Sequence, residues 1–171
     1  AVSLYPDHLL LAYCGEPLNS ILNTHYMVEL LKIFDIDINR LVKINDGDIL
    51  QNVYVPQPSF IENYSSHKII NEVYEKFSKY NTELNSKDFV YISRGKIYKG
   101  IFGIENENEL EECLINLGIK VIHIENLSIE VQLNVWGKYS NFIGFSGSSF
   151  HLGSLLSNKL FIIINRNEFL S

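Results

Sequence analysis

The chain has 171 residues, of which 46% are hydrophobic and 20% charged, and its formal net charge at pH 7 is -6. The acidic balance argues against nucleic acid or an anionic membrane as a partner, because both need clustered Lys and Arg to offset phosphate charge. The longest apolar runs are far shorter than the roughly 20 residues of a membrane-spanning helix. We therefore expect no membrane span in this chain, no nucleic-acid partner, and a soluble, cytoplasmic protein that reaches a membrane only through partners.

The first part of the chain predicts a small lobe that mixes strands and helices. The run LLLAYC is typical of a buried strand, and from Pro17 to Phe34 apolar residues recur at the three- and four-residue spacing of a helix. The runs RLVKI and ILQNVYV flank Asp46-Gly47, a frequent hairpin turn because glycine accepts a positive φ. We therefore expect two further strands here, paired as a hairpin.

The next segment is expected to connect two lobes. Ser65 or Ser66 is a suitable N-cap for a helix whose apolar residues form one stripe ending at Phe77. This predicts an N-terminal lobe over residues 1–64 and a connecting helix and linker over residues 65–86.

From residue 87 onward, strand and helix patterns alternate regularly. The runs DFVYIS, IKVIHI, NFIGF and KLFIII read as strands, and NENELEECLINLG, IEVQLNVWGKY and SSFHLGSLL read as the helices between them. Asn106 and Ser128 are the expected N-caps, and Gly118 is the expected C-terminal stop of the first of these helices. The alternation predicts a parallel sheet in a Rossmann-like lobe over residues 87–171.

Two features fall at carboxyl ends of these strands, where open parallel sheets bind ligands. Arg94 ends the first strand, and a glycine- and serine-rich stretch, residues 144–149, joins the third strand to the last helix. This stretch is neither a Walker A loop nor G-x-G-x-x-G. Its small residues would let backbone N–H groups and serine hydroxyls approach a phosphate. A tight turn without a ligand favours the same residues, so the stretch alone leaves both interpretations open.

Several short motifs follow one another in a fixed order. The first motif is the strand end Ser93-Arg94, and the last is a glycine turn with Gly144 and Gly147. Between them are two helix starts, one with Asn106, Glu107, Glu109 and Leu110 and the other with Leu127, Ser128 and Gln132. In this order the chain resembles the family 61 glycosyltransferases, mainly their C-terminal half and over about residues 25 to 165.

The resemblance implies a GT-B-like α/β fold, with two Rossmann-like lobes that contain parallel sheets and an N-terminal, acceptor-side lobe that is small or truncated. It also implies a nucleotide-sugar donor bound mainly by the C-terminal lobe, a glycan acceptor, and neither cofactor nor metal. The chain departs from the family pattern at two points. Ser146 stands where the family has a histidine, and a second arginine before the Asn-Glu helix start is missing. Lys96 or Lys99 is the candidate replacement for that charge, although an ammonium lacks the bidentate geometry of a guanidinium.

The resemblance places the donor next to residues that follow the strands. Arg94 and a lysine would neutralise the diphosphate leaving group, and the glycine-serine loop would donate hydrogen bonds to it. Glu130 is a further candidate for contacts with sugar hydroxyls, although glutamate is also common at an exposed helix start. The residues predicted to bind the donor and its phosphates are Arg94, Lys96, Lys99, Asn106, Gln132, Gly144, Ser146, Gly147, Ser148 and Ser149.

A general base for the acceptor hydroxyl is expected in the opposite lobe. His25 and Glu29 lie four residues apart on one predicted helix and are the candidate catalytic residues, while Asp7 and His8 are weaker candidates near the start of the chain. A single histidine on an amphipathic helix is more often structural.

Two short acidic stretches, Asp35-Ile-Asp37 and Asp46-Gly47-Asp48, match the Asp-x-Asp signature of metal-dependent glycosyltransferases of another fold. Both lie where turns are expected, and turns attract aspartate without any metal. We therefore interpret them as structural and expect no metal site.

These patterns predict a glycosyltransferase that moves a sugar from a nucleotide-sugar to a glycan acceptor in surface polysaccharide or glycoconjugate synthesis. Two alternatives stay open. One is a non-catalytic, glycosyltransferase-like module that binds a nucleotide or a partner subunit, and the other is a different α/β enzyme or phosphate-binding domain whose motifs match through shared architecture. The sequence leaves open the donor sugar, the base, the acceptor, the stereochemistry and the oligomeric state.

Overall fold

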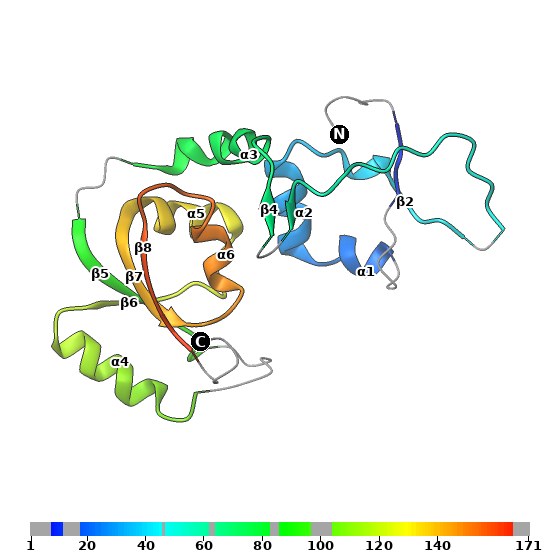
Figure 1. The fold of residues 1–171 in the computed structure, drawn as a ribbon. Coiled ribbons are helices and arrows are strands. Elements are labelled where there is room, and N and C mark those ends of the chain that lie inside the picture. Colours follow the sequence, from blue (N-terminus) through cyan, green and yellow to red (C-terminus); the bar gives the residue numbers. More distant parts are fainter. Residues whose placement is uncertain are drawn as a thin grey trace. The chain divides into compact units, whose positions relative to one another are not determined.

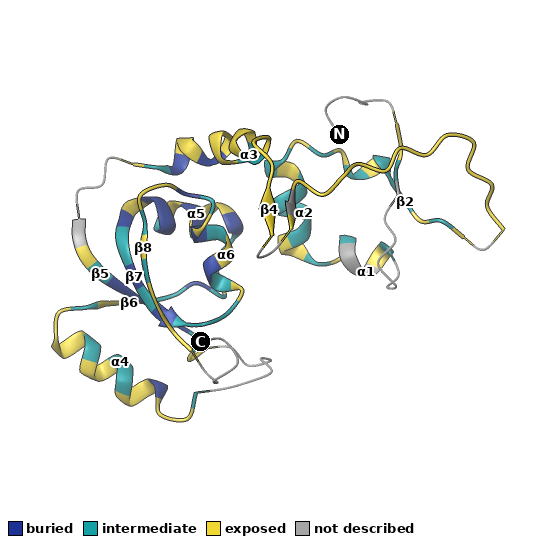
Figure 2. Cartoon of the chain, in the orientation of Figure 1, coloured by how far each residue is buried: buried dark blue, intermediate teal, exposed yellow. Residues whose placement is uncertain are grey.

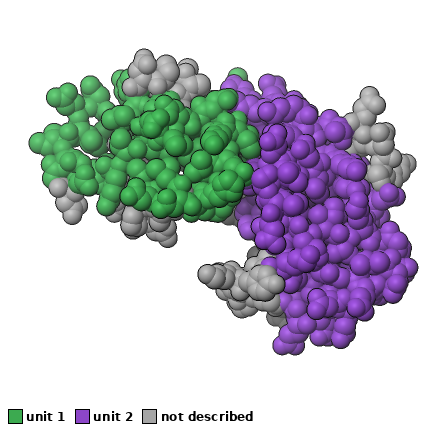
Figure 3. Space-filling model, turned by 180° about the vertical axis from the view of Figure 1, so that it is seen from behind, with its two compact units in different colours: residues 1–70 green, residues 71–171 purple. Residues whose placement is uncertain are grey.

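The computed structural model describes residues 8–11, 18–45, 47–61, 64–82, 86–96 and 104–165. The chain forms two compact units, residues 1–70 and residues 71–171 (Figure 3). The boundary falls at the start of helix α3 (Ile70–Phe77). Within the described ranges, no helix combines the length and the apolar content that crossing a membrane requires.

Unit 1 is built around a short strand–helix–strand unit. Its elements are β1 (Leu10–Leu11), α1 (Leu18–Leu22), α2 (His25–Ile33), η1 (Ile38–Arg40), β2 (Leu41–Val42), β3 (Phe60–Ile61) and β4 (Ser65–Ser66). Strand β1 pairs with β2 in parallel, with Leu10 opposite Leu41. Strands β3 and β4 form a separate antiparallel pair. The helical pattern predicted after Pro17 is confirmed, and it forms two consecutive helices, α1 and α2.

The predicted hairpin around Gly47 is wrong. Gly47 does adopt a positive φ of 94°, and the Asp48 carboxylate accepts a hydrogen bond from the Asn45 N–H at 2.7 Å, so a local turn forms. However, residues 48–58 contain no strand, and β2 pairs with β1 instead. The segment after the turn contains Pro56 and Pro58, which lack the N–H groups that a strand ladder needs.

The predicted cap at Ser65 or Ser66 is also wrong. These serines form β4, and helix α3 begins at Ile70. The His67 imidazole Nδ1 accepts a hydrogen bond from the backbone N–H of Ile69 just before that helix, at 3.2 Å. The apolar stripe does end in a buried residue, Phe77, as expected.

Unit 2 contains a four-stranded, fully parallel sheet in the order β6-β5-β7-β8 (Figure 1). Its elements after α3 are η2 (Ser78–Tyr80), β5 (Ser86–Ser93), α4 (Glu107–Asn116), β6 (Lys120–His123), α5 (Ile129–Lys138), β7 (Tyr139–Phe145), α6 (Ser149–Gly153) and β8 (Leu160–Ile164). Figure 1 shows α4 on one side of the sheet and α5 with α6 on the other. The predicted parallel α/β arrangement of this half is confirmed.

The helix ends of unit 2 follow local sequence signals. Gly118 has a φ of 79°, and the N–H groups of Gly118 and Ile119 close the end of α4 on the carbonyls of Ile115 and Leu114, both at 2.9 Å. This is the glycine-terminated pattern that a left-handed residue permits. Ser128 caps α5 by accepting a hydrogen bond from the Val131 N–H.

Four aromatic rings form the core between the sheet and helices α5 and α6. The ring centroids of Trp136 and Phe142 lie 4.4 Å apart, and Phe150 and Phe161 complete the cluster at centroid distances of 5.6 to 6.0 Å. Such pairs stabilise a core by about 0.5 to 1.5 kcal/mol each beyond the burial of their area. Burial is concentrated on the middle strands and on α5 (Figure 2). The carboxyl ends of β5 and β7 therefore rest on a rigid base.

Candidate functional site

The candidate site lies where β5 and β7 end side by side. These strands are neighbours in the sheet, yet the helices that follow them, α4 and α6, lie on opposite sides of it. The two loops therefore leave the sheet in opposite directions, and in open parallel sheets ligands usually bind outside the carboxyl ends at such a point. The first loop begins at Arg94, and the second begins at Ser146.

Arg94 reaches across from the first loop to the second. Its Nη1 donates a hydrogen bond to the Ser146 carbonyl oxygen at 3.2 Å. A Cβ atom at Gly147 would lie only 2.5 Å from the same Nη1, so the guanidinium lies directly against the glycine backbone. Within the part of the chain that the structure describes, Arg94 Nε and Ser146 Oγ are buried atoms without a hydrogen-bond partner.

The second loop turns within three residues, 146 to 148, before α6 begins. The Ser146 N–H continues the sheet by donating to the Ile164 carbonyl at 2.9 Å. The next three N–H groups, of Gly147, Ser148 and Ser149, have no acceptor among the described residues. Successive N–H groups beside a guanidinium form an arrangement suited to an anion such as phosphate.

Gly144 belongs to the sheet rather than to this loop. It is buried inside β7, and an added Cβ would lie 2.9 Å from the Phe150 ring and 3.1 Å from the Ile92 carbonyl oxygen. Its lack of a side chain therefore lets Phe150 pack closely onto the sheet. The sequence pattern grouped Gly144 with the phosphate loop, but its contacts in the structure are packing contacts.

Glu107 is a buried carboxylate at the start of α4, with 3% of its surface exposed. Its Oε1 accepts hydrogen bonds from the Arg94 N–H at 2.6 Å and the Tyr91 hydroxyl at 2.9 Å, and the Ser93 hydroxyl oxygen lies 3.2 Å from it. Burial, reinforced by the hydrogen bond to Glu107, raises the pKa of Tyr91 far above its usual value. Sequence reasoning included Glu107 in a motif but gave it no role, although the polar Ser93 at the end of an apolar strand was a signal for such a partner.

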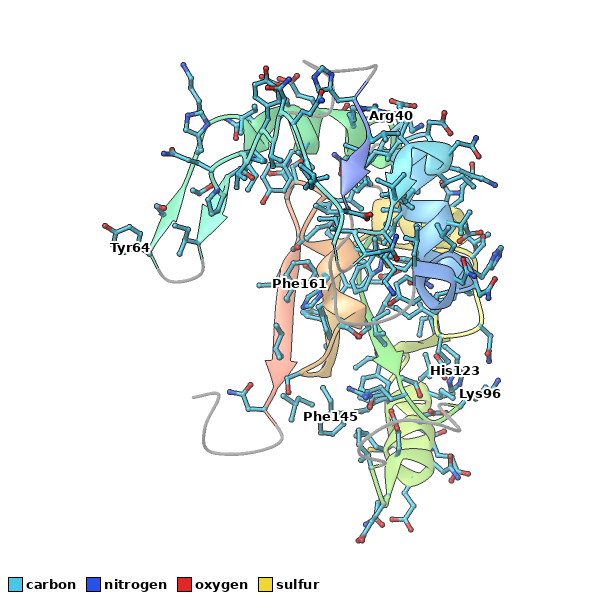
Figure 4. All side chains as sticks on the ribbon, turned by 90° about the vertical axis from the view of Figure 1, so that its right-hand side faces the viewer. Arg40, Tyr64, Lys96, His123, Phe145 and Phe161 are labelled. Carbon is cyan, nitrogen blue, oxygen red and sulfur yellow. The ribbon has the colours of Figure 1, made fainter. Side chains whose placement is uncertain are left out.

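A second group of charged residues lies beside the first loop, at the end of β6. His123 Nε2 is 3.6 Å from Glu111 Oε2, and His123 Nδ1 is 3.8 Å from Glu125 Oε1. Glu125 Oε1 also accepts a hydrogen bond from the Lys96 N–H at 3.1 Å, and the Ser93 hydroxyl donates to Glu111. Figure 4 shows the labelled Lys96 and His123 at this end of the unit. These contacts tie the start of the loop to both α4 and β6.

The other predicted donor residues have mixed surroundings. Lys96 and Asn106 are exposed, and Asn106 precedes α4 without a side-chain cap hydrogen bond. The Gln132 amide Nε2 donates to the Leu127 carbonyl at 2.9 Å and so braces the start of α5. Glu130 is exposed on the first turn of α5. Lys99 lies outside the described residues.

The predicted catalytic pair lies on α2 in unit 1. His25 Nε2 is 3.3 Å from Glu29 Oε1, and the His25 side chain is 85% exposed. The His8 ring lies edge-on to Tyr54, with centroids 5.6 Å apart. Asp7 lies outside the described residues. The structure thus brings together an exposed His25 and a half-buried Glu29.

The acidic pairs have local structural roles where they are described. Asp35 ends α2 with a positive φ of 56°, and the Asp37 carboxylate caps η1 by accepting a hydrogen bond from the Asn39 N–H at 2.9 Å. Asp48 closes the turn described above, and Asp46 lies outside the described residues. In the described ranges, no group of three or more His, Cys, Asp or Glu side chains is arranged to hold a metal ion.

Comparison with known families decides the affiliation of this chain. A family model described as Glycosyltransferase 61 matches residues 23–166. The chain belongs to the glycosyltransferase 61 family. Comparison with curated proteins and with solved structures gives no significant match to either. Membership of this family implies glycosyltransferase activity in general, and it confirms the resemblance carried by the motifs between Ser93 and Gly147.

Proposed function

We propose that this family 61 chain transfers a sugar from a nucleotide-sugar donor to a glycan acceptor, in the synthesis of a surface polysaccharide or glycoconjugate. The donor diphosphate binds between the loops after β5 and β7 in a GT-B-like, two-lobe enzyme. The observation that carries this proposal is the Arg94 guanidinium against the backbone of Gly147, beside three N–H groups without an acceptor among the described residues. Family membership supports the reaction class.

The chemistry of sugar transfer fits such a site. The bond between the anomeric carbon and the terminal phosphate oxygen breaks, and negative charge develops on the departing diphosphate. Donors aimed at that charge lower the barrier because the interaction strengthens as the charge forms. Arg94 supplies a guanidinium, and Gly147, Ser148 and Ser149 supply backbone N–H groups and two hydroxyls. Lys96, and Lys99 further along the same loop, add positive charge.

The remaining assignments complete the proposed reaction. Asn106 and Gln132, which follow the ends of β5 and β6, contact the donor outside its phosphates. The acceptor hydroxyl loses a proton when it attacks the anomeric carbon, and a general base speeds this step. His25, whose imidazole Nε2 lies 3.3 Å from the Glu29 carboxylate, is the proposed base because that contact orients the ring and leaves Nδ1 to accept the proton.

A second candidate function is a nucleotide-binding or partner-subunit module without transferase activity. It is favoured by Ser146, which stands where the family pattern has a histidine, because a hydroxyl cannot replace an imidazole in proton transfer at neutral pH. Both candidates predict nucleotide binding. They differ in whether nucleoside diphosphate is released from the bound donor when glycan acceptors are supplied.

Calorimetric titration tests the shared part of the proposal. The wild-type chain is titrated with UDP-, GDP- and CMP-sugars, each with and without Mn²⁺, and the titrations are repeated with Arg94→Ala. Lys138→Ala is the control, because Lys138 is an exposed cation at the C-terminal end of α5, away from the carboxyl ends of the strands. The expected result is binding of one nucleotide class without Mn²⁺, weakened at least tenfold but still measurable in Arg94→Ala and unchanged in Lys138→Ala. Equal binding by the wild type and Arg94→Ala would contradict the proposal.

A further inference from the structure

The position of Glu107 raises a physical question. A carboxylate next to a site for a diphosphate opposes the binding of that anion, and burying a charge costs free energy unless hydrogen bonds compensate. Glu107 is nevertheless buried directly behind Arg94, with the Arg94 N–H only 2.6 Å from its Oε1. Because the Glu107 carboxylate is unfavourable both for anion binding and for burial, we expect it to serve another purpose at this position.

The hydrogen bonds of Glu107 all come from the last part of β5 and the residue after it. Its Oε1 accepts from the Tyr91 hydroxyl and the Arg94 N–H, while Ser93 Oγ, which donates its one proton to Glu111, lies 3.2 Å from the same oxygen. The Ser93 hydroxyl oxygen accepts from the Gly95 N–H at 2.9 Å. Glu107 therefore holds the backbone at Arg94 directly, and Ser93 holds the next residue.

The fixed backbone limits where the long Arg94 side chain can place its guanidinium. An arginine loses much rotamer entropy when it is fully ordered, so the position of its guanidinium is well defined only if its backbone and its far end are both held. The far end of Arg94 is held by one hydrogen bond of 3.2 Å to the Ser146 carbonyl. The near end is held by Glu107. The Arg94 Nε, which has no partner among the described residues, then keeps a constant direction.

We infer that Glu107 is a positioning residue for Arg94: it fixes the loop after β5 so that the guanidinium points across the carboxyl end of the sheet toward the incoming diphosphate. The inference rests on the proposed function for the role of Arg94. Glu107 does not touch the donor, and its charge is offset by the two hydrogen bonds it accepts from Tyr91 and Arg94. Charged acceptors bind donors about twice as strongly as neutral ones, which explains a carboxylate rather than an amide at this position.

The first test is a double-mutant cycle in nucleotide affinity. UDP and GDP are titrated into the wild type, Glu107→Gln, Arg94→Ala and the double variant, with Glu112→Gln, an exposed position on α4, as the control. Glu107→Gln is expected to weaken binding by roughly tenfold, which corresponds to 1.4 kcal/mol. The same change in the Arg94→Ala background is expected to alter affinity less than about twofold, because the two residues act as one unit. Equal losses in both backgrounds would overturn the inference.

The second test needs no nucleotide. In ¹⁵N relaxation measurements on the free protein, the Arg94 Nε–H signal, assigned by its loss in Arg94→Lys, is expected to be rigid in the wild type and mobile in Glu107→Gln. Glu107→Asp, which keeps the charge, is expected to lie between the two. An unchanged Nε–H signal in Glu107→Gln would overturn the inference. If no nucleotide binds the wild type while Glu107→Gln frees Arg94, the proposed function fails and the positioning role stands.

Discussion

Gly147→Ala is expected to damage the candidate site while leaving the fold intact. The new Cβ would lie 2.5 Å from Arg94 Nη1, whereas ordinary contacts of this kind begin at 3.4 Å, so the guanidinium must move by about 0.9 Å. The hydrogen bond from Nη1 to the Ser146 carbonyl is lengthened or broken by that displacement, and water replaces the carbonyl because the contact is only part-buried. The displaced guanidinium also loses its position against the donor diphosphate; a charge-assisted hydrogen bond of that kind contributes about 1.5 to 3 kcal/mol, so we expect nucleoside diphosphate affinity to fall roughly 10- to 150-fold.

The same substitution should change stability little. Gly147 does not have a positive φ, so alanine fits its backbone without strain, and we expect the free energy of unfolding to change by less than about 1 kcal/mol. Titration calorimetry measures the affinity and urea unfolding measures the stability. Ser157→Ala, in the exposed loop after α6, is the control and should leave both unchanged. Wild-type affinity in Gly147→Ala would refute the reasoning, because it would mean that the position of Arg94 does not matter for binding.

Two further predictions concern the base of the site. Gly137→Ala should lower the free energy of unfolding, measured in urea, by at least about 2 kcal/mol, because the new Cβ would collide with the backbone carbonyl of Tyr80. The control Asn134→Ala, on the same helix, should stay within about 0.7 kcal/mol of the wild type. Similar stabilities of the two variants would contradict the packing described. Tyr91 has a raised pKa in the folded state, so above pH 10 the unfolded chain loses this proton first and stability falls by up to about 1.4 kcal/mol per pH unit. Tyr91→Phe should therefore lose stability less steeply than the wild type between pH 10 and 11 in urea unfolding, and parallel curves would rule out this coupling.

Much of unit 2 could be predicted because its signals are local. Each strand contains an apolar run, and Gly118 and Ser128 end α4 and begin α5 in the structure as the pattern indicated. The hairpin around Gly47 failed for a non-local reason. The turn forms, but the partner of Leu41 is Leu10, far back in the chain, and a local turn signal contains no information on that pairing.

In the candidate site, too, local features could be predicted from the sequence, whereas contacts between distant residues could not. The position of Arg94 at a strand end could be predicted from the apolar run before it. Its contact with Ser146, 52 residues later, depends on the strand order that makes β5 and β7 neighbours. Gly144 and Gly147 look alike in the sequence, but Gly144 lies within the sheet and Gly147 lies in the loop, and only the end point of β7 separates these roles. The partners of Glu107 likewise depend on how α4 packs against β5.

The central claim is that the loops after β5 and β7 bind the diphosphate of the donor. An NMR titration of ¹⁵N-labelled protein with UDP and GDP tests it most directly, through the backbone signals of Gly147, Ser148 and Ser149 and the side-chain Nε–H of Arg94. These four signals are expected to show the largest saturable shifts, and at the same nucleotide concentrations the three backbone shifts are expected to be much smaller in Arg94→Ala. Saturable shifts centred elsewhere in the chain, with these signals unmoved, would contradict it.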